Sequence, residues 1–215
     1  MKNLLPILGI SLFLFSCGTN NDKDTNTQSE STIVEEKVSN CVFSYNNDAT
    51  GIFWKAYKHT NKVGVNGRFD VFDVSFAEES NTIEGLLEGL KLSVDVQSVN
   101  SNDTLRDGKI RRHFFGSMLN TNMITGEIIA VNGSTGKLKM KLNDLEQTIP
   151  VDLSIVGEEV ELRATIDILS FAANAAYDAL GEACAEKHTG GDGVRKFWSD
   201  VDIYIKTVVA KSCPE

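Results

Sequence analysis

Apolar and polar residues alternate with a period of two along most of the chain after residue 38. This period is typical of β-strands that bury one face and leave the other face in water. We therefore expect a strand in each segment where the alternation is sustained. These segments are residues 90–97, 137–142, 149–155, 160–168 and 201–209.

Glycine-containing segments separate the expected strands. NGSTG, Asn132 to Gly136, predicts a hairpin connection, because Asn and Gly favour tight turns. It is not a phosphate-binding loop, which needs four residues between the glycines and a Ser or Thr after the lysine. Gly157 marks another turn. Repeated strands joined by turns favour an antiparallel sandwich or barrel, and the alternation alone does not distinguish the two.

One segment has helical rather than alternating spacing. Residues 170–188, SFAANAAYDALGEACAEKH, are alanine-rich, and their larger apolar residues recur at helical intervals. Ser170 is the expected N-cap. The sequence therefore predicts many strands and one helix, inserted before the last strand.

The N-terminus has the pattern of an export signal. Lys2 precedes an apolar run, Leu4 to Phe15, that is too short to span a bilayer. The following LFSC sequence resembles a bacterial lipobox, so we expect residues 1–16 to be a signal peptide and Cys17 to be lipidated. Acyl chains on Cys17 would anchor the protein to a membrane. By resemblance to the bacterial sorting rule, Gly18 instead of Asp indicates the outer membrane.

The next segment has the composition of a flexible tether. Residues 17–37 are polar and lack aromatic side chains, so they cannot bury enough surface to fold. Residues 38–215 are long enough for one domain with a sizeable core.

The charge of the chain is acidic, with one basic exception. The net charge is −9, and removal of Lys2 with the signal lowers it by one more. This argues against nucleic acid as a partner. The exception is TLRDGKIRRHFF, residues 104–115, which places a dense group of cations directly before two phenylalanines.

Cysteine usage predicts one disulfide but no metal site. If Cys17 is lipidated, Cys41, Cys184 and Cys213 remain, and export favours a disulfide. Our prediction is Cys184 with Cys213, although Cys41 with either of them fits the sequence equally well. Cys184 and His188 lack the two further ligands that a zinc site would need. No nucleophile, base and acid stand out together, so we expect neither an enzyme nor a cofactor.

Two segments of the domain resemble conserved motifs of the YceI-like family. VGVNGRFDVF, residues 63–72, resembles the V-x-G-x-F-x-x-F signature, and Lys58-His59 resembles the Lys-His pair before it. Residues 98–115 are similar to the family's S-I-x-T…R-D-x-H-L-R-S-x-D-F-F segment. The resemblance covers roughly residues 40–210. It departs at Ala49-Thr50, where the family has His-Ser, and at residues 109 and 113.

The resemblance implies a fold and a function. The expected fold is all-β, an extended antiparallel lipocalin-like β-barrel of about eight strands with one inserted α-helix. Family members occupy the bacterial periplasm or envelope and hold long isoprenoid or quinone-like lipids inside the barrel. We therefore expect a lipid-anchored envelope carrier of such a lipid, with a homodimer also allowed. The alternative is an envelope structural or interaction module whose barrel is filled and binds no ligand.

The resemblance also implies site residues. Arg106, Asp107 and Arg111 match the motif's polar positions and are expected to meet a ligand headgroup. Phenylalanines are expected to line the tunnel: Phe69, Phe72, Phe114 and Phe115. The alternative interpretation is that Asp107 pairs with an arginine, the other cations face water and the phenylalanines close the core.

Overall fold

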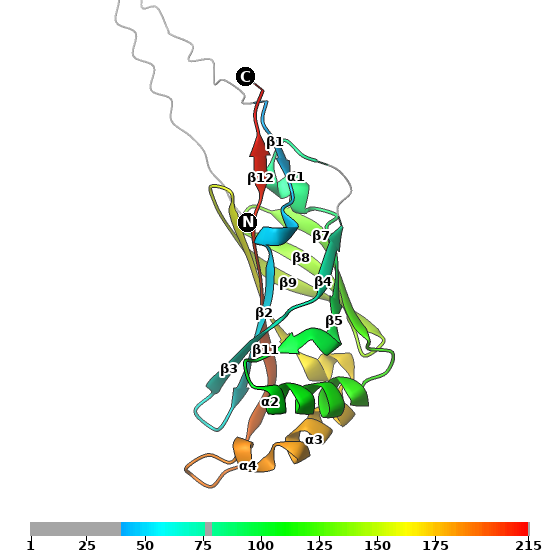
Figure 1. Ribbon diagram of the computed structural model, residues 1–215, viewed down its shortest axis with the longest axis vertical. Helices are drawn as coiled ribbons and strands as arrows, with labels where there is room; N and C mark the ends of the chain where they lie inside the picture. The colour runs from blue at the N-terminus through cyan, green and yellow to red at the C-terminus, as the bar shows by residue number, and fades with distance from the viewer. Residues whose placement is uncertain (1–39, 76–78, 215) are drawn as a thin grey trace, which may run out of the picture. The chain divides into compact units, whose positions relative to one another are not determined.

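The computed structural model describes residues 40–75 and 79–214 (Figure 1). They belong to a compact unit, Ser39–Glu215. The expected signal peptide, Cys17 and the expected tether all lie outside the described residues, so these assignments remain predictions.

The described chain forms mainly one curled sheet of ten antiparallel strands. This confirms the predicted fold class, an antiparallel lipocalin-like curled sheet, and five of its strands overlap the five alternating segments. In spatial order the strands are β4 (Phe72–Ser75), β5 (Lys91–Asp95), β7 (Met123–Asn132), β8 (Thr135–Leu142), β9 (Leu145–Val156), β10 (Glu159–Asp167), β11 (Phe197–Val208), β2 (Gly51–Lys58), β3 (Val63–Phe69) and β6 (Val99–Asn100).

The two edges of the sheet meet because two strands continue past a short break: β3 continues as β4, and β5 continues as β6. Only two residues separate β3 from β4, and the short 3₁₀ helix η2 (Val96–Ser98) separates β5 from β6. The amide of Asp70 donates to Ser98 O at 3.2 Å, and the amide of Asp95 donates to Val71 O at 3.1 Å. If each interrupted pair is counted as one strand path, the ten strands become the eight that the resemblance implied.

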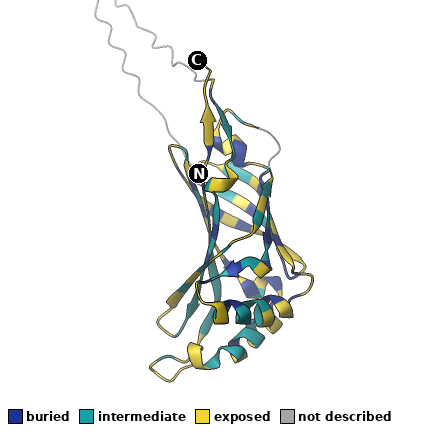
Figure 2. Cartoon of the chain, viewed as in Figure 1, coloured by how far each residue is buried: buried dark blue, intermediate teal, exposed yellow. Residues whose placement is uncertain are grey.

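The inward-facing side chains form the core, as the alternation predicted. On β8, Leu138, Met140 and Leu142 are at most 6% exposed, and the inward positions of β5 and β10 are buried as well. Figure 2 shows buried and exposed residues alternating along the strands. The β7–β8 turn has Gly133 at φ +58°, a left-handed conformation that glycine adopts without strain.

The helices differ from the single helix that was expected. The structure has α1 (Ile83–Leu87), α2 (Thr104–Lys109), the π-helical turn η3 (Ile110–Phe114), α3 (Asn174–Ala183) and α4 (Ala185–His188), with single 3₁₀ turns at Asn47–Ala49, Phe115–Ser117 and Ile168–Phe171. Helices α2, α3 and α4 gather at one end of the sheet (Figure 1). The expected cap at Ser170 is wrong, because Asp167 instead starts a 3₁₀ turn and Ala172, at φ +52°, ends it before α3 begins.

Helix α2 lies within the basic segment and has no apolar stripe that a periodicity search could find. Its N-cap is Asp103, whose carboxylate accepts from the amides of Leu105 at 3.1 Å and Arg106 at 3.0 Å. Leu105 is 81% exposed, so the helix buries little apolar surface of its own. Local capping therefore starts this helix, and packing of the following aromatic residues holds it in place.

The predicted disulfide is wrong. Cys41 is bonded to Cys213, whereas Cys184 is a free, partly buried thiol. The reason is the short antiparallel pair of β1 (Val42–Ser44) and β12 (Ala210–Ser212), in which Val42 lies opposite Ser212 and brings the adjacent cysteines together. Cys184 lies at the end of α3, among the helices at the other end of the sheet (Figure 1).

We expect the double variant Cys41→Ser/Cys213→Ser to lose about 2–5 kcal/mol of unfolding free energy, because the disulfide closes a loop of 172 residues in the unfolded chain. Urea unfolding of the exported protein measures this loss. Cys184→Ser is the matched control and should change the unfolding free energy by less than about 1 kcal/mol. Equal losses in both variants would contradict the pairing.

Candidate functional site

The structure brings three of the four expected tunnel phenylalanines together. The ring centroids of Phe69 and Phe115 are 6.2 Å apart, and those of Phe114 and Phe115 are 5.1 Å apart. Phe115 is 7% exposed, whereas Phe69, Phe72 and Phe114 are partly buried and pack against the core. The four phenylalanines therefore belong to or pack against the core, with Phe69 and Phe72 on the sheet and Phe114 and Phe115 on the helical segment, and their role in ligand binding stays a prediction.

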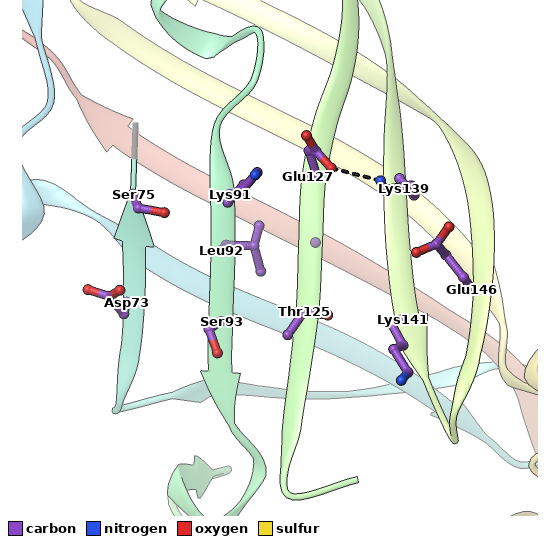
Figure 3. A pocket seen from close by; sticks show the side chains of 11 residues that line it. Asp73, Ser75, Lys91, Leu92, Ser93, Thr125, Glu127, Lys139, Lys141 and Glu146 are labelled. Carbon is purple, nitrogen blue, oxygen red and sulfur yellow. Dashed lines mark ion pairs between the residues drawn. The ribbon is translucent and has the colours of Figure 1, made fainter. Parts of the chain in front are cut away.

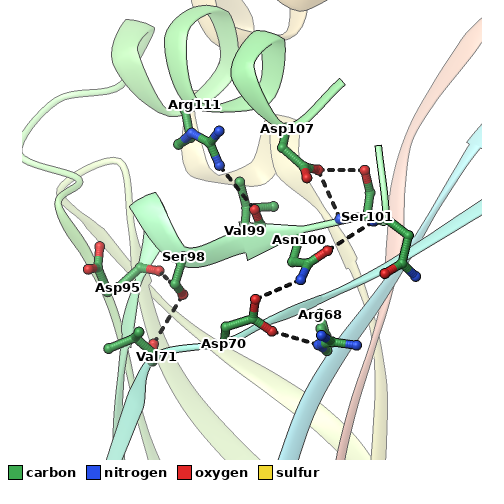
Figure 4. A network of polar contacts seen from close by, with 11 residues as sticks. Arg68, Asp70, Val71, Asp95, Ser98, Val99, Asn100, Ser101, Asp107 and Arg111 are labelled. Carbon is green, nitrogen blue, oxygen red and sulfur yellow. Dashed lines mark hydrogen bonds and ion pairs between the residues drawn. The ribbon is translucent and has the colours of Figure 1, made fainter. Parts of the chain in front are cut away.

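The expected headgroup residues bind the protein's own backbone and side chains, as Figure 4 shows for Asp107 and Arg111. Arg106 donates to Ser101 Oγ at 2.8 Å and to Ser101 O at 3.0 Å, and Asp107 accepts from Ser101 N and Oγ. Arg111 donates to Val99 O at 3.2 Å. The alternative interpretation that Asp107 pairs with an arginine is therefore wrong within the described residues. These contacts hold α2 and η3 against β6, and a headgroup role remains a prediction.

The same region holds a second group of polar contacts, at the point where the edges of the sheet meet (Figure 4). Asp70 accepts from Arg68 Nε and from Asn100 Nδ2, each at 2.6 Å. Both hydrogen bonds lower the pKa of Asp70 below its usual value, and the bond from Arg68 has the larger effect. Ser98 Oγ donates to Asp95 O at 2.7 Å. The group spans both strand interruptions, so we interpret it as structural.

One part of the inner face is incompletely covered. Strands β11, β2 and β3 are neighbours in the sheet, and β4 continues the path of β3. On β2, Ile52 and Trp54 are buried, but the other inward apolar residues of these four strands pack against the core and stay partly exposed, unlike the buried inward residues of β8 and β10. These partly exposed residues, called the open inner face below, are Ala56, Val65, Phe69, Phe72, Val74, Val201, Ile203 and Ile205.

A small apolar cavity adjoins the open inner face. Its volume is about 30 Å³. The resemblance implied an elongated tunnel, but this cavity is far too small for a prenyl chain. The side chains around it would have to move before such a chain could enter. The lining residues are Tyr45, Thr50, Ile52, Val74, Leu87, Leu90, Leu92, Ile128, Val160, Leu162, Ile205 and Thr207.

The lining residues include three that carry hydroxyls, Tyr45, Thr50 and Thr207, and none of the lining residues is ionic. Thr50 Oγ1 donates to Thr207 Oγ1 at 2.7 Å, and Thr207 is 7% exposed. Burial raises the pKa of the Tyr45 hydroxyl. Sequence reasoning missed these residues, although Thr207 was detectable as a polar residue at an inward position of β11.

A larger hollow, of about 370 Å³, lies on the outward face of β4, β5, β7, β8 and β9 (Figure 3). Its acidic and basic side chains alternate across the strands, and Lys139 Nζ lies 2.8 Å from Glu127 Oε2. This hydrogen bond lowers the pKa of Glu127 and raises that of Lys139. Opposite charges on neighbouring strands stabilise a sheet. Because these charged side chains lie on the outward face, we interpret the hollow as part of the solvated side of the fold.

Three rings stack where α3 and α4 meet β11. Phe197 lies between Tyr177, at a centroid distance of 4.0 Å, and His188, at 4.8 Å. The pKa of His188 is lowered to about 4, mainly by burial and to a smaller extent by the positive charges of Lys58 and Arg195. The imidazole is therefore neutral at physiological pH.

The His188 environment predicts a pH-dependent stability. Its folded pKa lies below the usual 6.5, so the unfolded chain binds the proton first. The stabilisation is complete above pH 6.5 and decreases as the pH falls toward 4. Between pH 7 and pH 5, wild type should lose about 1 kcal/mol more unfolding free energy than His188→Phe, a figure reduced for solvent screening. Urea unfolding at both pH values checks this, and parallel losses would contradict it.

Within the described residues, no group of three or more His, Cys, Asp or Glu side chains is arranged to hold a metal ion. No helix in this part of the chain is long and apolar enough to cross a membrane. Both statements apply to residues 40–75 and 79–214.

The curled antiparallel sheet with an apolar inner face places the protein in the lipocalin-like class. The chain belongs to the YceI-like family, because the YceI-like domain model matches residues 28–207. No curated protein matches the sequence at a significant level.

Two solved structures share the fold at 13% sequence identity. A polyisoprenoid-binding domain from Saccharophagus degradans, implicated in plant cell wall breakdown, aligns with a TM-score of 0.53 over 82% of this chain and 99% of its own. BcnA of Burkholderia cenocepacia aligns with a TM-score of 0.52 over 78% and 99%, respectively. At this identity the likeness concerns the fold.

Proposed function

We propose that this protein binds a long apolar isoprenoid or quinone-like lipid against the inner face of its curled sheet. The observation that carries the proposal is the open inner face, where apolar side chains point toward the core yet remain partly exposed. Family membership supports it, as does the fold shared with a polyisoprenoid-binding domain. We further propose that lipidation of Cys17 anchors the protein in the bacterial envelope, at the outer membrane.

Burial of apolar surface would drive binding. Each Å² of apolar surface removed from water contributes about 25 cal/mol, so an apolar chain that covers the open inner face gains affinity along its length. The cavity of about 30 Å³ means that this gain is offset by the cost of displacing side chains. Partly buried residues such as Ile203 and Ile205 are the least expensive to displace.

A second candidate is an envelope interaction module with a filled interior and no ligand. The small cavity favours it, because the protein's own side chains already occupy that part of the sheet's interior. The two candidates differ in whether the inner face takes up a lipid. We propose no catalytic activity for either.

Two experiments test the proposal. The first is native mass spectrometry and lipid extraction of protein expressed with its signal peptide. The second is titration of delipidated protein with decylubiquinone and farnesol. A copurifying isoprenoid, or saturable binding of either probe, supports the carrier function. Protein that is recovered without lipid and binds neither probe supports the filled module instead.

Ile205→Phe should weaken decylubiquinone binding at least about ten-fold, because the larger side chain fills space beside the cavity that the ligand would occupy. Lys206→Met is the matched control on the opposite face of β11 and should bind within about two-fold of wild type. Isothermal titration calorimetry measures both. Unchanged binding by a folded Ile205→Phe protein would place the ligand elsewhere.

Cys17→Ser should move the protein from the membrane pellet to the soluble fraction, because stable anchoring requires the acyl chains. Fractionation of the native host, with intact-mass analysis of the purified protein, measures this change. Cys184→Ser is the control and should stay in the pellet. Retention of Cys17→Ser in the pellet, or an unmodified wild-type mass, would contradict lipidation.

A further inference from the structure

Trp54 occupies the middle of the inner surface. It is 9% exposed and follows Ile52 in the inward alternation of β2, and Ile52 lines the small cavity. Across the sheet it lies opposite Ile203 on one side and Gly67 on the other. A Cβ at Gly67 would collide with the Trp54 ring, so the glycine makes room for the indole.

The indole nitrogen of Trp54 is a buried donor without a partner among the described residues. Trp198, the other tryptophan of the chain, donates from Nε1 to His59 O at 2.9 Å. Buried polar groups are almost always hydrogen-bonded, and an indole N–H is able only to donate.

One other buried side-chain atom in the described residues lacks a partner, His188 Nδ1. His188 differs from Trp54, because a neutral imidazole carries its proton on either nitrogen. His188 is therefore able to present Nδ1 as an unprotonated acceptor. Trp54 has no such alternative, which makes its N–H the stronger indication that an acceptor is missing.

The surroundings restrict the chemistry of that acceptor. Next to Trp54 on the inner face lie Ile203 on β11 and, two residues to either side of Gly67 on β3, Val65 and Phe69. The cavity beside the preceding inward residue, Ile52, has no ionic lining residue. An anion placed there would lose its hydration without gaining a counter-charge, which is costly. An alcohol would add a donor of its own that needs an acceptor. A carbonyl oxygen only accepts, so it matches a single unpartnered donor.

We infer that Trp54 Nε1 donates a hydrogen bond to an uncharged carbonyl oxygen of the bound lipid, as found in quinones and prenyl ketones. This inference rests on the proposed function and specifies the ligand class. The carbonyl end lies at Trp54, and the apolar remainder extends along the open inner face. Because Nε1 is fully buried, the ligand reaches it only when the side chains around it move, as the small cavity already requires.

The test compares farnesylacetone, a prenyl ketone, with β-farnesene, a prenyl hydrocarbon, by calorimetric titration of wild type, Trp54→Phe and Trp198→Phe. Phenylalanine keeps an aromatic ring at residue 54 but removes the N–H. We expect Trp54→Phe to weaken ketone binding about ten-fold and to leave hydrocarbon binding within about two-fold of wild type. Trp198→Phe should change neither, because its N–H serves the protein backbone.

A second measurement does not depend on the Trp54 variant folding. In wild type, the C=O stretching band of bound farnesylacetone should move to lower wavenumber than in hexane, as expected for a hydrogen-bonded carbonyl. An unshifted band, or equal weakening of ketone and hydrocarbon binding by Trp54→Phe, would overturn the inference while leaving the lipid-binding proposal intact. Tighter binding of farnesyl phosphate than of the ketone would also overturn it. If no prenyl compound binds wild type, both proposals fail.

Discussion

The backbone hydrogen bonds at the two strand interruptions are the constraint on which the rest of the fold depends. Asp70 with Ser98, and Asp95 with Val71, connect the path of β3 and β4 to that of β5 and β6. Together with the β3–β6 and β4–β5 pairings, these bonds leave no open edge at this seam, where unpaired backbone groups would invite pairing with other chains. With these bonds the sheet curls, and its apolar faces converge on a common interior.

Curling determines what the basic segment does. Residues 104–115 pass from β6 across one end of the sheet, and Arg106 and Arg111 attach this segment to Ser101 and Val99. The arginines thereby hold Phe115 over the inner face, where it contacts Phe69. The cations lie next to the phenylalanines because the arginines position a helical cover over an apolar interior.

The interior combines tight packing on one side with incomplete coverage on the other. Inward residues of β8 and β10 are buried, whereas those of β11, β3 and β4 remain partly exposed. Trp54 lies on β2, between β11 and β3, and contributes the one indole donor that lacks an acceptor among the described residues. A lipid with a single acceptor oxygen would complete both the apolar coverage and this hydrogen bond.

The sequence by itself determined five of the ten strands of the main sheet and their inward faces, because a period of two depends only on local backbone geometry. It also indicated the family through residues 63–72 and 98–115. Tertiary structure decided the features that depend on distant residues. The pairing of β1 with β12 selected Cys41 as the partner of Cys213. The unpartnered donor of Trp54 became visible only in three dimensions, since a hydrogen bond is satisfied by neighbours in space and not by neighbours in sequence.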